Sequence, residues 1–100
     1  MDGNAIDRPI GQSDIAPALA ALDRALGEES AYGDLVEASR RLVLLRGMLI
    51  AERRRGAPDP DRRLDRLNAI LSLVVAAEYP LEGARRERIT TARRELAALA

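Results

Sequence analysis

Hydrophobic residues recur every three or four positions along most of the chain, which is the spacing of one face of an α-helix. The pattern predicts four helices, at about 14–26, 30–55, 60–78 and 81–99. The β-branched residues Val43, Val74 and Val75 lie inside these helical patterns and lack the flanking turn residues of a strand. The sequence therefore predicts an all-α fold.

Capping residues and prolines indicate where the helices begin and end. Ser13 or Asp14 is expected to cap the first helix. Asp59 is a strong N-cap for the third helix, with Pro60 at its first position. Pro80 disfavours helical geometry at the residue before it and should end this helix at about residue 78.

The chain of 100 residues is long enough for one domain and too short for two independent cores. Residues 1–12 hold two glycines, a proline and only scattered apolar residues, so a loosely held tail is expected there. Residues 13–100 are expected to form one four-helix, bundle-like domain. In it the second and third helices form a long antiparallel hairpin, and the first and fourth pack across it. The expected core residues are Leu19, Leu22, Leu35, Leu42, Leu45, Leu49, Leu67, Leu71, Val74, Ile89 and Leu96.

The helix at 30–55 departs from the usual pattern of a surface helix, whose outer side is polar. Its outer row is charged at both ends, where Glu37 should pair with Arg41, but it is apolar for about two turns at Leu44, Met48 and Ala51. Two further rows are apolar throughout and are expected to face inward. They consist of Leu35, Leu42 and Leu49, and of Val36, Val43 and Ile50.

The helix at 60–78 has a similar stretch at 69–77, whose only polar residue is Ser72. An antiparallel hairpin places Met48 level with about Asn68 and Leu44 level with about Ser72, so the two apolar stretches overlap. A contiguous apolar surface marks an interface, and a second copy of the chain is the simplest cover. In the alternative, the first and fourth helices cover it within one monomer. The residues expected at a homodimer interface are Leu44, Met48, Ala51, Ser72 and Val75.

The chain is neutral overall, yet its charges are unevenly distributed. Residues 1–37 hold eight acids and two arginines, a net charge of −6, whereas 38–100 hold eight acids and fourteen arginines, a net charge of +6. The candidate anion or nucleic-acid contacts are Arg46 and the cluster at the hairpin turn, Arg53, Arg54, Arg55, Arg62, Arg63 and Arg66.

These arginines permit two interpretations. One is a surface for a phosphate backbone or an acidic partner, and the other is a set of solvated helix faces. Nucleic-acid binders usually carry net positive charge or stacking aromatic residues, and this chain has neither beyond Tyr32 and Tyr79. Arg46 is expected to extend along the apolar surface to water, with an anion-binding crevice as the alternative.

The absence of Cys and His excludes thiolate nucleophiles, zinc fingers, haem ligation, Ser-His-Asp triads and di-iron bundles, so no metal or cofactor is expected. Glu28 and Glu29 are better explained as solvated residues near a helix end than as a catalytic dyad. One enzyme class stays open. Small dimeric all-α mutases have a compatible length and bind dianionic substrates with buried arginines, although this chain lacks any Lys.

The start of the chain carries Asp2 and Asp7 and has no cationic or apolar segment typical of a secretory signal. The longest uncharged stretch, Leu67 to Ala77, is far shorter than the ~20 apolar residues that a membrane span needs. Both observations favour a cytoplasmic protein without a membrane segment, and the use of Arg in place of Lys is typical of a GC-rich bacterial genome.

Taken together, these features predict a non-catalytic helical interaction protein, a small regulatory, adaptor or accessory subunit that binds a protein partner and associates with itself. The alternative function is an Arg-rich nucleic-acid-binding regulator.

Overall fold

Four α-helices make up the part of the chain that the structure, a computed structural model, describes: residues 10–56 and 62–99. They are α1 (Gln12–Ala25), α2 (Tyr32–Arg54), α3 (Arg63–Val75) and α4 (Ala84–Ala97). These two ranges contain no β-strand. The predicted all-α fold of four helices is confirmed.

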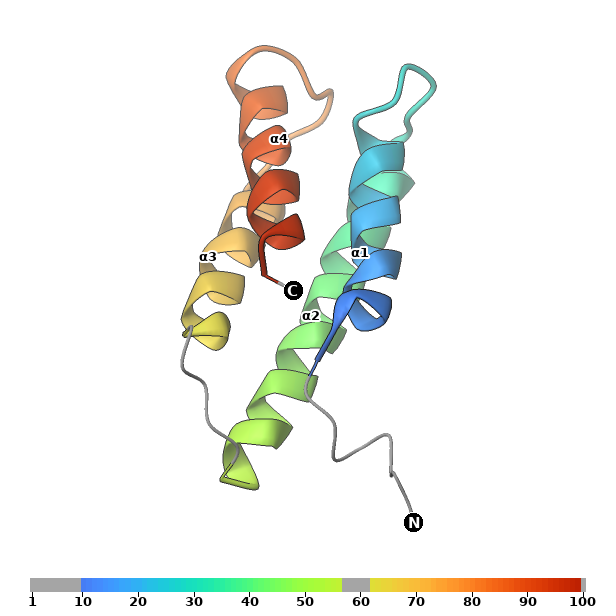
Figure 1. Cartoon of the computed structure of the whole chain (residues 1–100). Helices are drawn as coiled ribbons and strands as arrows, with labels where there is room; N and C mark the ends of the chain where they lie inside the picture. The colour runs from blue at the N-terminus through green and yellow to red at the C-terminus, as the bar shows by residue number, and fades with distance from the viewer. Residues whose placement is uncertain (1–9, 57–61, 100) are drawn as a thin grey trace.

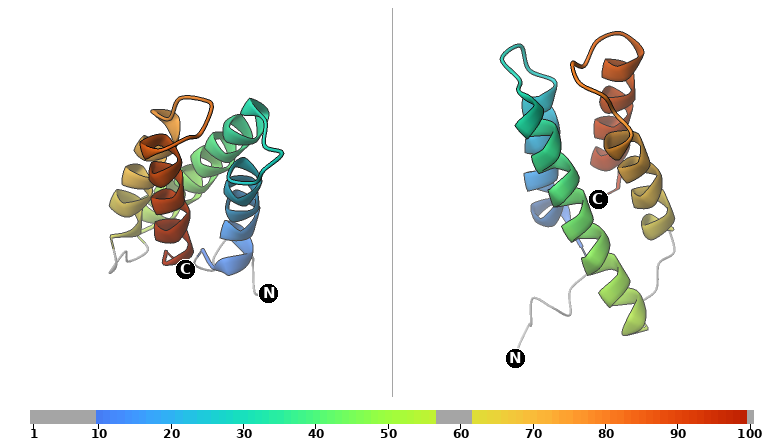
Figure 2. Two further views of the ribbon diagram at one scale, coloured as in Figure 1. Left: turned by 90° about the horizontal axis from the view of Figure 1, so that it is seen from above. Right: turned by 180° about the vertical axis from the view of Figure 1, so that it is seen from behind.

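Each helix packs against the next one in the sequence, and α4 packs back against α1 (Figure 1). The chain descends along α2 and ascends along α3, so the two helices form an antiparallel hairpin. Seen from behind, α2 and α3 lie in front, with α1 behind α2 and α4 behind α3 (Figure 2). The arrangement is bundle-like, and none of the helices formed by the described residues packs against one side of the hairpin.

The first helix begins earlier than the sequence indicates, because its capping group lies elsewhere. Gly11 is the N-cap residue, and the Asp14 carboxylate accepts a hydrogen bond of 3.0 Å from the Gly11 amide. The expectation that Ser13 or Asp14 is itself the cap is therefore wrong, although Asp14 supplies the hydrogen bond from the third helical position. Asp34 does the same for α2, accepting from the Ala31 amide at 2.9 Å.

The third helix ends before residue 78 and the fourth begins after residue 81, and the chain between them makes contacts of its own. The Tyr79 hydroxyl donates a hydrogen bond of 2.7 Å to the Ser30 carbonyl. The Tyr79 ring lies edge-on to Tyr32, with the ring centroids 6.1 Å apart. These contacts tie the loop between α3 and α4 to the loop between α1 and α2. The expected cap Asp59 and its neighbour Pro60 lie outside the described residues.

The core follows the predicted pattern closely. All the expected core residues are buried except Leu19 and Leu71, which are partly buried and pack against the rest. Ile10 is also buried, although it precedes the first helix. Small residues outside the expected core list are also fully covered between the helices: Ala18, Ala21, Ala25, Ala38 and Ala92.

One ion pair is enclosed at the end of the bundle where α2 finishes and α3 begins. A Glu52 carboxylate oxygen, Oε1, accepts a hydrogen bond of 3.1 Å from the Arg63 guanidinium, and the two side chains are only 9% and 13% exposed. Arg63 also donates to the Ile10 carbonyl at 3.1 Å. The second carboxylate oxygen, Oε2, is buried and has no hydrogen-bond partner among the described residues. Arg63 thus joins α2, α3 and the segment before α1.

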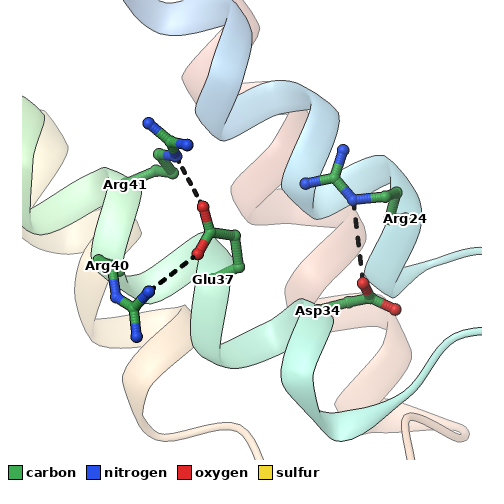
Figure 3. Close-up of polar contacts among 5 residues, drawn as sticks. All are labelled: Arg24, Asp34, Glu37, Arg40 and Arg41. Carbon is green, nitrogen blue, oxygen red and sulfur yellow. Dashed lines mark hydrogen bonds and ion pairs between the residues drawn. The ribbon is translucent and has the colours of Figure 1, made fainter.

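The remaining ion pairs lie at the surface. Glu37 accepts from Arg41 at 2.8 Å and Arg40 at 3.4 Å, which confirms the predicted pairing of Glu37 with Arg41 (Figure 3). Arg24 of α1 lies 3.8 Å from Asp34 of α2. Arg93 of α4 donates to Asp23 of α1 at 2.9 Å, and this hydrogen bond and the Asp23 charge raise the pKa of Arg93.

We expect Glu52→Ala to destabilise the fold by about 3 kcal/mol, because it leaves a largely buried guanidinium without its carboxylate. The matched control, Glu37→Ala, removes the two surface ion pairs with Arg40 and Arg41 and should cost less than about 1 kcal/mol. Urea denaturation followed by circular dichroism at one protein concentration measures both. Equal losses of stability in the two variants would contradict the importance of the enclosed pair.

Candidate interaction surface

Large apolar side chains are exposed along the outward side of α2. Val43 is 51% exposed, Leu44 57% and Met48 42%. Val36, two turns before Val43, is also exposed. The opposite side of the helix explains this, because Ala38, Leu42, Leu45 and Leu49 already occupy the core at helical spacing. The exposed residues therefore have no place inside this monomer.

The prediction that Val36, Val43 and Ile50 form an inner row is wrong. Val36 and Val43 are exposed, and Ile50 is only partly buried. Both rows considered from the sequence were apolar, so their composition could not show which one faces the core. The residues of α2 that do face the core follow one another at steps of three and four, from Leu42 through Leu45 and Leu49 to Glu52. This spacing is the signal that distinguishes the inner row from the outer one.

The five predicted interface residues lie on two neighbouring parts of this surface. Leu44 and Met48 are exposed on α2, and Ala51 beside them is partly buried. Ser72 and Val75 are exposed on α3. The structure does not place these two groups in one hollow, because the α2 residues that share a hollow with Val75 lie on a different side of the helix from Leu44.

Two shallow hollows meet at Val75 on the seam between α2 and α3. The first lies on α3, and its lining residues are Asn68, Leu71, Ser72, Val75 and Ala76. The second crosses to α2, and its lining residues are Tyr32, Leu35, Val36, Ser39, Val74, Val75 and Ala77. Neither contains a charged residue, although charged residues make up 32% of the chain. Together with Val43, Leu44 and Met48 of α2, they form a largely apolar surface, which we call the α2–α3 face. The exposed Arg40, Arg41 and Arg46 lie beside it.

The arginines of the hairpin turn do not form one exposed cluster. Arg53, Arg54 and Arg55 are exposed at the end of α2. Arg63 is instead largely enclosed with Glu52 and is removed from any anion-binding surface. Arg62, at the surface, lies 3.4 Å from Asp65.

Two further arginines have specific surroundings. Arg66 donates to the Ala98 carbonyl at 3.2 Å, which joins α3 to the end of α4. Arg46 is exposed, in agreement with a side chain that extends to water. The arginines that stay open to a ligand are therefore Arg46 and the three at the end of α2.

Another hollow lies on the outer side of α4, and its lining residues are Gly83, Ala84, Arg86, Glu87, Thr90, Thr91 and Arg94. Its two arginines are opposed by the Glu87 carboxylate, and Arg86 already donates to the Leu26 carbonyl at 2.7 Å. This arrangement gives the hollow little preference for an anion.

Within residues 10–56 and 62–99, no three acidic side chains lie close enough together to hold a metal ion. None of the helices in these ranges combines the length and the apolar character needed to cross a membrane. No protein-family model matches the chain, and the comparisons with curated proteins and with solved structures likewise find no match.

Proposed function

We propose that this protein is a non-catalytic interaction protein, a small cytoplasmic adaptor, regulatory or accessory subunit that associates with itself and with a protein partner through the α2–α3 face. The observation that carries the proposal is the exposure of Val43 and Leu44 on one turn of α2 and of Met48 on the next. Single exposed apolar residues are ordinary, whereas a contiguous set marks a binding surface.

The magnitude of the hydrophobic effect supports this interpretation. Complete burial of a Val, Leu or Met side chain stabilises a complex by about 1.5–3 kcal/mol. Because the three side chains are about half exposed in the monomer, each has roughly 1 kcal/mol still to gain. An α-helical partner offers the complementary apolar row that such a surface needs.

Leu44→Glu/Met48→Glu should convert a dimer into a monomer, because it introduces four unpaired carboxylates into an apolar two-fold interface. Sedimentation equilibrium of the wild type and the variant at micromolar concentration measures the change. The matched control is Ala16→Glu/Ala20→Glu, which adds two carboxylates with the same spacing on the exposed side of α1. We expect this control to remain dimeric.

A monomeric wild type at these concentrations would contradict self-association. If instead the wild type and both variants are equally dimeric, the interface lies outside the α2–α3 face. Circular dichroism of each variant shows that the helices have been retained, so that loss of the dimer is not caused by unfolding.

Nucleic-acid binding is the second candidate, and one observation favours it: the consecutive arginines Arg53, Arg54 and Arg55 have no ion pair within the described part of the chain. Under our proposal, fluorescence anisotropy detects no duplex DNA binding tighter than the non-specific range of about 10⁻⁴–10⁻⁶ M at physiological salt. The second candidate instead requires tighter binding, which weakens steeply with salt and is lost in Arg53→Ser/Arg54→Ser/Arg55→Ser.

A further inference from the structure

In the described part of the chain, unpaired side chains of opposite charge gather at the two ends of α2. Glu28, Glu29 and Glu82 are exposed in the loops at one end, and no ion pair involves them within the described residues. Arg53, Arg54 and Arg55 are exposed at the other end. Figure 1 shows that the loops after α1 and after α3 lie together at the top, whereas α2 finishes at the bottom.

The arginines near the acidic end offset only part of its negative charge. Arg85 is used by Glu78, to which it donates at 2.9 Å. Arg24 lies beside Asp34. Arg86 donates to the neutral Leu26 carbonyl and keeps its positive charge, so it offsets one of the three glutamates. The remaining negative charge at this end is left to interact with groups outside the monomer.

The apolar residues lie midway between these two charged ends. Val43 is the central residue of α2, eleven positions from Tyr32 and eleven from Arg54. Leu44 and Met48 follow it. At Gly47, between them, the space within 4 Å of the position that a side chain's first carbon would occupy is open, so another helix can approach closely here. The acidic loops, the apolar residues in the middle of α2 and the arginines at its end thus follow one another along the bundle. The exposed Arg40, Arg41 and Arg46 flank the apolar residues.

We propose that α2 packs antiparallel against α2 of a second copy of this chain, about a two-fold axis near Val43. The glutamates Glu28 and Glu29 of each copy then lie beside the arginines at the end of α2 in the other. This inference rests on the proposed function, since it takes the α2–α3 face as the contact surface, and it adds the partner's identity and orientation.

Helix geometry and charge both select this orientation. With a rise of 1.5 Å per residue, Tyr32 and Arg54 each lie about 16 Å from Val43, in opposite directions. A two-fold axis at Val43 therefore places Arg54 of one copy level with Tyr32 of the other, next to the acidic loop. The parallel arrangement would bring arginines against arginines and glutamates against glutamates, and such like-charge contacts disfavour an alternative pairing.

The distance between the two acidic ends of the dimer tests the orientation. The chain has no cysteine, so Ala31→Cys provides a single spin-label site per copy at the exposed start of α2. The antiparallel arrangement places the two labelled backbone positions about 36 Å apart, twice the rise over the twelve residues from Val43. A dimer with its labels within about 20 Å of each other would overturn the antiparallel arrangement and leave the proposed function intact.

Charge reversal tests the contact between the glutamates and the arginines. Glu28→Arg/Glu29→Arg should raise the dimer Kd at least tenfold, and adding Arg54→Glu/Arg55→Glu should restore it to within threefold of the wild type. The control Glu87→Arg/Glu95→Arg makes the same change in net charge on exposed positions of α4 and should alter the Kd less than threefold.

The outcomes of these two experiments are distinguishable. Equal weakening by Glu28→Arg/Glu29→Arg and by the control, or no recovery in the fourfold variant, would overturn the inferred charge contact. A monomeric wild type would overturn the self-association on which the inference rests. Binding of a different protein's helix by a wild type that stays monomeric would likewise exclude the second copy as the occupant.

Discussion

The enclosed contact between Glu52 and Arg63 fixes how α2 and α3 lie against each other. A buried carboxylate is costly unless a cation and further hydrogen bonds accompany it, so the two helices cannot slide past one another without separating the pair. The contact sets the register at one end of the hairpin, and at the other end Val36 and Val75 line the same hollow. Because Arg63 also holds the Ile10 carbonyl, the segment before α1 is bound at the same place.

This register has a consequence for the outer side of the hairpin. The core is completed by α1 and α4 on one side only, and small residues such as Ala38 and Ala92 allow the helices to approach closely. The leucines of α2 that face inward are enough to fill this space. The apolar residues on the other side of the helix add little to the monomer's core.

Helical periodicity was sufficient to predict the number of helices and most of the core, because leucine at steps of three and four leaves little choice of face. It was insufficient for α2, where apolar residues occur on nearly every side. The Glu52–Arg63 contact was also missed, since its members lie eleven positions apart across a turn. The available signal was Glu52 itself, a charged residue that continues the inward row of Leu45 and Leu49.

The contact between Tyr32 and Tyr79 places the aromatic chromophores of the molecule at one end of the bundle. These are its only tyrosines, it has no tryptophan, and both rings lie at the end of the bundle away from Arg63. Near-ultraviolet absorption and intrinsic fluorescence therefore report on the loops beside Ser30 and are insensitive to the opposite end. Far-ultraviolet dichroism, in contrast, averages over all four helices. A difference between the two signals during unfolding would thus reveal the order in which the two ends of the bundle come apart.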